Sequence, residues 1–275
     1  MTLAARLSEF RSSFARKELG HGGYSWSYWR GGAPGEAVLW LTGALGVGEL
    51  AFLPAVRIGA DFRVLVPDYP AVSGLNAMAD GLAALLDAER LGAVHVVGGS
   101  FGGMVAQHFV RRFPERVCSL VLSHTTAPDP SYLRAGLMRA VSLLVPERPY
   151  RALVSRRLRG SFLVADPFWV EYFDSTMQCL TKHDLVSRAT LASEFLQSHF
   201  GPTDLEGWPG AVLIISGEDD PMMPTVSHAA LRALYPTASA HTFSGMGHSA
   251  AILQPEEYVD VIREFLAAGA AQDQL

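Results

Sequence analysis

Short apolar segments alternate with longer amphipathic segments along most of this chain. The apolar segments predict seven strands, at residues 25–29, 38–42, 62–66, 94–97, 117–122, 212–216 and 239–243. The central segments are almost continuously apolar, which is typical of parallel strands covered on both faces. Apolar positions at helical spacing predict helices at residues 49–58, 76–90, 104–112, 225–234 and 255–268. The alternation predicts an α/β fold with a doubly wound, mostly parallel sheet, whose active residues lie at the carboxyl ends of its strands.

Residues 127–207 interrupt this alternation. The segment is rich in arginine and aromatic residues, contains no clear strand and has the pattern of several helices. We therefore expect a core formed by residues 1–126 and 208–275. Residues 127–207 are expected to form an inserted helical cap, or lid, over the carboxyl edge of the sheet.

Composition narrows the function classes. A chain of 275 residues with 49% hydrophobic residues can bury a sizeable core, and a net charge of −5 does not suggest a nucleic-acid partner. No apolar stretch reaches membrane-spanning length, so no membrane partner is expected. The N-terminal residues favour an amphipathic helix over a transit peptide, so we expect a cytoplasmic protein. The expected partner is a small-molecule substrate. The oligomeric state is left open.

The two cysteines, Cys118 and Cys179, are far apart and have no paired spacing. They indicate neither a disulfide framework nor a zinc site, and we expect no metal. Cys118 lies within a predicted strand, where we expect a small buried side chain.

The clearest chemical motif is Gly98-Gly99-Ser100-Phe101-Gly102-Gly103, between a predicted strand and a predicted helix. A serine on such a sharp turn is held in a strained conformation with its hydroxyl exposed, and a Cβ at either flanking glycine would collide with its neighbours. The helix that follows places partial positive charge where an anion develops during acyl transfer. The motif predicts a nucleophile elbow.

Two later motifs supply a candidate acid and a candidate base. Gly217-Glu218-Asp219-Asp220-Pro221 follows the sixth predicted strand, and either aspartate could serve as the acid. His248 lies beside a glycine in the loop after the last predicted strand, the best placed of the nine histidines to reach the serine. The order serine, aspartate, histidine is that of α/β-hydrolases rather than of the two main serine protease folds.

With these three motifs, the sequence resembles the α/β-hydrolase superfamily over essentially its whole length, in its lid-bearing, lipase- or esterase-like branch. The resemblance implies that Ser100 is the nucleophile, His248 the general base and Asp220, rather than Asp219, the residue that orients the histidine. It also implies an oxyanion hole formed by the backbone N–H groups of Phe101 and Ala44. No metal or organic cofactor is implied.

Two loops depart from the pattern of that superfamily. Thr42-Gly43 stands where members commonly have His-Gly, and the Pro67–Gly74 segment replaces a Pro-Gly-His-Gly-x-Ser stretch. Both changes resemble the maspardin-like branch, whose members keep an elbow serine and are thought to act mainly as binding proteins. Whether Thr42 leaves a working oxyanion hole is a question for the structure.

The substrate pocket is predicted from residues near the carboxyl edge and in the cap. His124 follows the fifth predicted strand, where it could line the pocket or hydrogen-bond its own loop. Phe168, Trp169 and Tyr172 suggest an apolar pocket, although such aromatic residues could equally pack the cap onto the core.

Three functions remain. The leading hypothesis is a cofactor-free serine hydrolase of the carboxylesterase type, which cleaves a small, largely apolar ester through an acyl-enzyme. The second is a carbon–carbon bond hydrolase or a lyase with the same triad. The third is a catalytically silent, maspardin-like binding protein.

Overall fold

The computed structural model describes residues 1–129, 134–161, 166–223 and 225–272. Its single eight-stranded sheet has the order β1-β2-β4-β3-β5-β6-β7-β8. The strands are β1 Ala15–His21, β2 Tyr24–Gly32, β3 Ala37–Leu41, β4 Arg63–Pro67, β5 Val94–Gly99, β6 Val117–Ser123, β7 Ala211–Gly217 and β8 Ser239–Phe243. Pairing is parallel from β4 through β8, and β1 and β2 add two antiparallel pairings at one edge. The predicted doubly wound, mostly parallel sheet is confirmed.

All seven predicted strands are present, and β1 is an additional one. Its sequence, Ala-Arg-Lys-Glu-Leu-Gly-His, has no buried position and no apolar alternation, so sequence periodicity does not mark it. It becomes a strand because its backbone pairs with β2 along its full length, from Ala15 opposite Arg30 to His21 opposite Tyr24.

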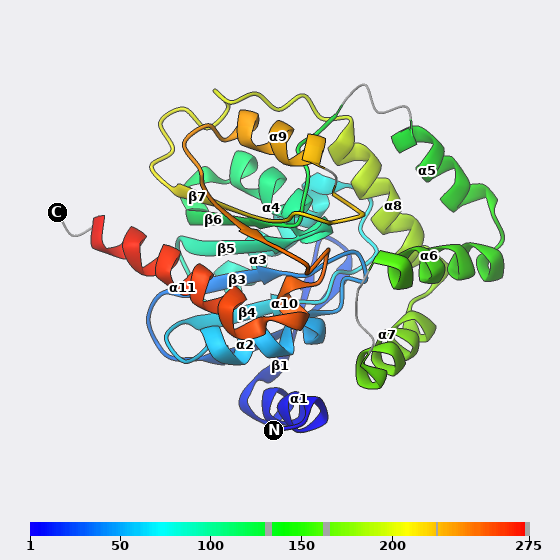
Figure 1. Ribbon diagram of the computed structural model, residues 1–275, viewed down its shortest axis with the longest axis horizontal. Coiled ribbons are helices and arrows are strands. Elements are labelled where there is room, and N and C mark those ends of the chain that lie inside the picture. Colours follow the sequence, from blue (N-terminus) through cyan, green and yellow to red (C-terminus); the bar gives the residue numbers. More distant parts are fainter. Residues whose placement is uncertain (130–133, 162–165, 224, 273–275) are drawn as a thin grey trace.

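Helices cover both faces of the sheet (Figure 1). One apolar core contains side chains of α3 Leu75–Ala88, α4 Phe101–Arg112, α8 Lys182–Leu196 and α9 Thr225–Leu234. The opposite core contains side chains of α1 Leu3–Ser13, α2 Phe52–Ile58, α7 Pro167–Cys179, α10 Ala250–Leu253 and α11 Pro255–Gln272. Burial on both faces explains why strands such as β3 are apolar at every position.

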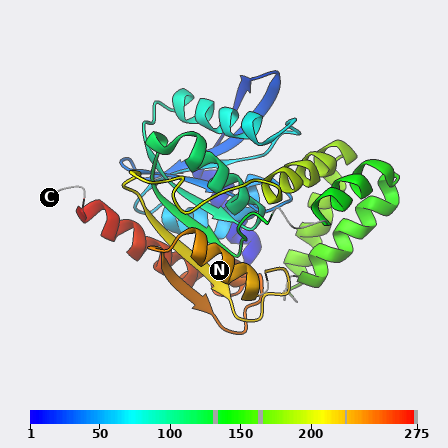
Figure 2. The same cartoon turned by 90° about the horizontal axis from the view of Figure 1, so that it is seen from above.

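Between β6 and β7, the described residues form four helices. They are α5 Arg134–Leu144, α6 Glu147–Ser161, α7 and α8. Figures 1 and 2 show them beside one end of the sheet, on the side opposite the C-terminal end of α11. This segment is helical where residues 127–207 were expected to be, and its described part contains no strand.

The burial predicted for Cys118 is wrong. Its side chain is exposed, as is that of Cys179. Cys118 is the second residue of β6, at the amino-terminal end of the strand, and every other residue of β6 is buried. Strand position alone therefore did not determine burial.

Candidate active site

Ser100 lies on the sharp turn between β5 and α4. Its backbone has φ 53° and ψ −118°, which is uncommon for a residue with a side chain and is typical of a strained functional turn. Hydrogen bonds hold the turn on both sides, because Ser100 N donates to Ser123 O at 2.8 Å and Gly103 N donates to Ser100 O at 3.0 Å. The predicted elbow conformation is present.

The glycines that flank the serine are required by close backbone approach. A Cβ at Gly98 would lie 2.5 Å from Gly102 O, and a Cβ at Gly102 would lie 2.2 Å from Leu41 O. Both distances are far below van der Waals contact, and the obstructing atoms belong to the backbone. The helix can therefore pack this closely on β3 and β5 only when both positions are glycine.

His248 and Asp220 form a buried pair in the loops that follow β8 and β7. His248 Nδ1 donates to Asp220 Oδ2 at 2.7 Å, and the side chains are 4% and 0% exposed. Asp219 instead accepts a hydrogen bond from Gly247 N at 3.0 Å. The structure thus pairs the histidine with Asp220, while Asp219 holds the loop that carries it.

The Asp220 carboxylate is held in its ionised form. Burial alone would raise its pKa, but the hydrogen bond and charge of His248 lower it. Its other oxygen, Oδ1, accepts hydrogen bonds from the backbone N–H groups of Met222 and Met223 at 2.8 and 3.0 Å. The net result is a pKa below the ordinary value for aspartate, so the carboxylate can keep a proton on His248 Nδ1 and leave Nε2 as the basic nitrogen.

His124 packs against this pair. Its ring meets the His248 ring edge-on, with centroids 5.6 Å apart, and its Nδ1 lies 2.9 Å from Ser123 Oγ. Its φ of 48° is unusual for a residue other than glycine. Burial, together with repulsion from His248, lowers its pKa to about 4, so His124 is neutral near pH 7. His124 also lines the cavity that contains Ser100, so the structure supports both sequence alternatives, a place in the pocket wall and a local hydrogen bond.

Ser100 and His248 line one cavity of about 170 Å³. The cavity is bounded by the loops after β3, β5 and β6, by α6 and α7, and by the start of α10. Its wall is mainly apolar and includes Trp40, Leu41, Leu45, Leu50, Leu53, Leu158, Trp169, Phe173, Met222, Ile252 and Tyr258. A mainly apolar cavity with a few polar groups is what a small-molecule site requires.

The candidate oxyanion residues are on either side of the serine. Phe101 begins α4 directly after Ser100, and Ala44 lines the cavity together with Gly43. A Cβ on Gly43 would lie 3.8 Å from Ser100 Cβ, so this loop runs close to the serine. Ala44 therefore lines the cavity close to Ser100, and Phe101 follows Ser100 directly in the chain.

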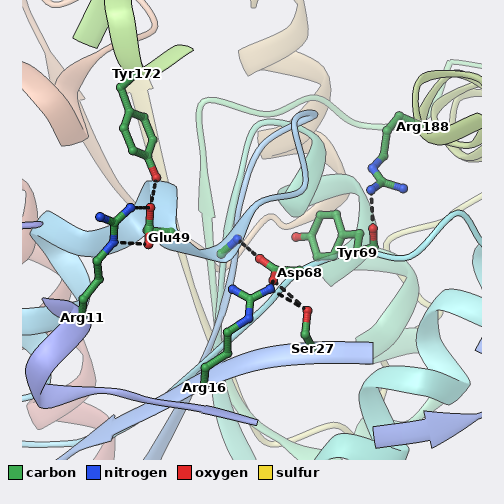
Figure 3. A network of polar contacts seen from close by, with 9 residues as sticks. Arg11, Arg16, Ser27, Glu49, Asp68, Tyr69, Tyr172 and Arg188 are labelled. Atoms are coloured by element: carbon green, nitrogen blue, oxygen red, sulfur yellow. Dashed lines mark hydrogen bonds and ion pairs between the residues drawn. The ribbon is translucent and has the colours of Figure 1, made fainter. Parts of the chain in front are cut away.

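The two atypical loops are bonded to each other. Tyr69 Oη donates to Thr42 O at 2.9 Å, and the Tyr69 ring packs on Phe101. Figure 3 shows Arg188 of α8 bound to the Tyr69 carbonyl, and the same guanidinium donates to Pro70 O at 3.0 Å. Tyr69 therefore braces the Thr42 loop where the superfamily commonly uses a histidine.

A second polar network ties α7 to the core. Tyr172 Oη donates to Glu49 Oε1 at 2.6 Å, and Arg11 binds both Glu49 oxygens at 2.7 Å (Figure 3). These hydrogen bonds hold the pKa of Glu49 below its usual value, against the opposing effect of burial. The network joins α1, the 3₁₀ helix Gly48–Ala51 and α7.

Only one of the three aromatic pocket candidates lines the cavity. Trp169 does so, and Phe173 from the same helix joins it. Phe168 and Tyr172 are not among the lining residues. They stack on each other with centroids 5.8 Å apart, and both rings lie near Phe52.

Several lining residues carried no signal in the sequence. Tyr258 reaches the cavity from α11, and Leu158 reaches it from α6. Met222 follows Asp220 by two positions, so its proximity to the acid could have indicated it. No group of three histidine, cysteine, aspartate or glutamate side chains within the described residues could hold a metal ion.

A family model described as the alpha/beta hydrolase family matches residues 19–261. The chain belongs to this family. Among the helices that the structure describes, none is long and apolar enough to cross a membrane.

Three curated relatives illustrate the range of this alpha/beta hydrolase's neighbours. It is 26% identical to poly(3-hydroxyalkanoate) depolymerase of Ectopseudomonas oleovorans, over 79% of this chain and 80% of the relative. It is 28% identical to 2-hydroxy-6-oxo-2,4-heptadienoate hydrolase of Pseudomonas putida, over 71% of each chain. It is 26% identical to maspardin of Danio rerio, over 76% of this chain and 67% of the relative. The resemblance to both hydrolases and maspardin is therefore confirmed.

Solved structures agree on the fold. A hydrolase from Pseudomonas aeruginosa PA01 matches with a TM-score of 0.79 and 20% identity, over 91% of this chain and 98% of the other. A thermophilic esterase from Thermogutta terrifontis matches with a TM-score of 0.76 and 22% identity, over 93% and 99%. At such identities the likeness bears on the fold alone.

Proposed function

We propose that this alpha/beta hydrolase is a cofactor-free serine hydrolase that cleaves a small, largely apolar ester. The proposal rests on one arrangement: a mainly apolar cavity of about 170 Å³ lined by Ser100, the Ala44 loop and His248, whose ring is hydrogen-bonded to the buried Asp220. The helical segment within residues 127–207 acts as a cap, since α6 and α7 contribute Leu158, Trp169 and Phe173 to the cavity wall.

The reaction proceeds in two acyl-transfer steps. His248 takes the proton of the Ser100 hydroxyl as its oxygen attacks the ester carbonyl carbon, and the N–H groups of Phe101 and Ala44 stabilise the oxyanion. The ester C–O bond then breaks, and the leaving alcohol receives the proton from His248. Water, deprotonated by His248, attacks the acyl-enzyme and releases the carboxylic acid and free Ser100. Asp220 keeps its negative charge and stabilises the imidazolium in both steps.

Carbon–carbon bond hydrolysis is the second candidate. It is favoured by the similarity to 2-hydroxy-6-oxo-2,4-heptadienoate hydrolase. That relative is 28% identical to this chain, and the depolymerase is 26% identical. The maspardin similarity favours a silent binding protein instead. Against that function, a binding protein has no chemical need for an ionised, buried carboxylate hydrogen-bonded to a histidine beside a strained serine.

A fluorophosphonate probe and an ester panel separate these candidates. The hydrolase predicts covalent labelling of the folded protein that is lost in Ser100→Ala, together with turnover of short p-nitrophenyl esters. Absence of labelling in protein shown to be folded by circular dichroism would contradict an active enzyme. Labelling of Ser100 without turnover of any ester would contradict the esterase and favour carbon–carbon bond hydrolysis.

A further inference from the structure

A second, smaller cavity of about 120 Å³ lies between α6 and α7. Ser155 and Leu158 enter it from α6, and Val170, Phe173 and Met177 enter it from α7. Leu45, from the loop after β3, closes the side toward the core. The cavity is thus built inside the helical segment rather than in the sheet.

This cavity adjoins the one that contains Ser100. Leu45, Leu158 and Phe173 line both, so the partition between the two cavities consists of three apolar side chains. Leu45 is also the residue after Ala44, the candidate oxyanion donor. A substituent that extends from an acyl group on Ser100 along the Ala44 loop therefore reaches this partition first.

The chemistry of the second cavity is aliphatic. Its polar residues are Ser155 and the ion-paired Arg159 and Asp174, whose side chains are 58% and 35% exposed. Because those two charges neutralise each other and lie at a solvent-facing end, they offer the interior of the cavity no unpaired charge. A thin, flexible hydrocarbon chain can pass between three apolar side chains, whereas a rigid ring system would have to displace them.

We propose that the second cavity binds the distal methylene groups of an unbranched acyl chain whose carbonyl is held at Ser100. This inference rests on the proposed function and deepens it, because it assigns the substrate class as linear aliphatic acyl esters. Leu158 and Phe173 are the residues that determine how much of the chain is admitted.

The test is a series of p-nitrophenyl esters from acetate to decanoate, assayed with the native protein and two variants. For each methylene that enters the second cavity, kcat/KM is expected to rise by up to about fourfold, the equivalent of about 0.8 kcal/mol. Ser155→Phe fills this cavity from α6, and it is expected to lower the decanoate-to-acetate ratio of kcat/KM by about tenfold or more. Ala152→Phe is the matched control, because Ala152 is exposed on the same helix and lines neither cavity.

Leu158→Ala provides a change in the opposite direction. Removing part of the partition is expected to raise the relative rate for octanoate and decanoate. The inference is overturned if Ser155→Phe and Ala152→Phe give the same chain-length profile, or if the preference follows the alcohol of alkyl acetates instead of the acyl chain. Acetate turnover and Ser100 labelling would persist in that case, whereas failure of the proposed function removes both.

Discussion

Replacing Asp220 by asparagine tests the buried acid–base pair with little change of shape. In the native protein Oδ1 accepts from Met222 N and Met223 N, and Oδ2 accepts from His248 Nδ1. An asparagine that keeps the two backbone hydrogen bonds through its carbonyl oxygen must place its NH₂ group against His248 Nδ1. The ring then has to accept at Nδ1 and carry its proton on Nε2, so Nε2 can no longer take the proton of Ser100.

The expected loss is large in activity and modest in stability. Forcing the wrong histidine tautomer in a serine triad lowers kcat by about 10⁴-fold, equivalent to about 5.4 kcal/mol of transition-state stabilisation. The unfolding free energy is expected to fall by only about 1–3 kcal/mol, because one charge-assisted hydrogen bond is weakened while the backbone bonds to Oδ1 are preserved.

The assay is kcat for p-nitrophenyl acetate, with thermal unfolding of the same samples. Asp219→Asn is the matched control, because Asp219 bonds Gly247 N rather than His248. It is expected to retain kcat within about tenfold of the native value, since it acts only through the loop. Asp220→Asn with more than a tenth of native kcat, or equal losses in the two variants, would refute the assignment of Asp220.

Two further predictions concern the surroundings of the site. Because the pKa of His124 is lowered to about 4, its contribution to stability is fully present above pH 6.5 and is lost as the pH falls toward 4. Asparagine tolerates the positive φ at this position, so His124→Asn tests the effect without backbone strain. The variant should make the fall of the unfolding free energy between pH 6.5 and 4 shallower by up to about 1.4 kcal/mol per pH unit, measured by urea unfolding. Identical slopes in the native protein and the variant would exclude this effect. Tyr172→Phe removes the hydrogen bond to the half-buried Glu49 and should lower the unfolding free energy by about 1 kcal/mol. An unchanged melting temperature would mean that aromatic packing alone holds α7 on the core.

The elbow shows what a sequence can determine by itself. Its geometry depends on steric rules that act within a few residues, so Gly98, Ser100 and Gly102 predict the turn, its strain and the close approach of α4. The doubly wound, mostly parallel sheet follows in the same way from alternating apolar and amphipathic segments, and the family resemblance follows from three motifs in order.

Contacts between residues that are distant in the sequence depended on the tertiary structure. Asp219 and Asp220 are adjacent, and the residues alone do not separate them: the family resemblance implied Asp220, and the position of the loop that carries His248 places that carboxylate against the ring. Trp169 and Tyr172 lie on one helix, and only the docking of α7 decides that the first lines the cavity and the second bonds Glu49.

β1 and the hydrogen bond from Tyr69 to the Thr42 loop also depend on how separate elements pack. β1 is polar and is a strand only because β2 offers it a backbone partner, and Tyr69 supports Thr42 from 27 residues away. The sequence by itself determined the fold class and the elbow, because local sterics and hydrophobic periodicity act over a few residues, and the candidate triad was implied by the resemblance of three motifs to the α/β-hydrolase superfamily. Only the tertiary structure decided which side chains meet, because those contacts depend on how whole elements pack.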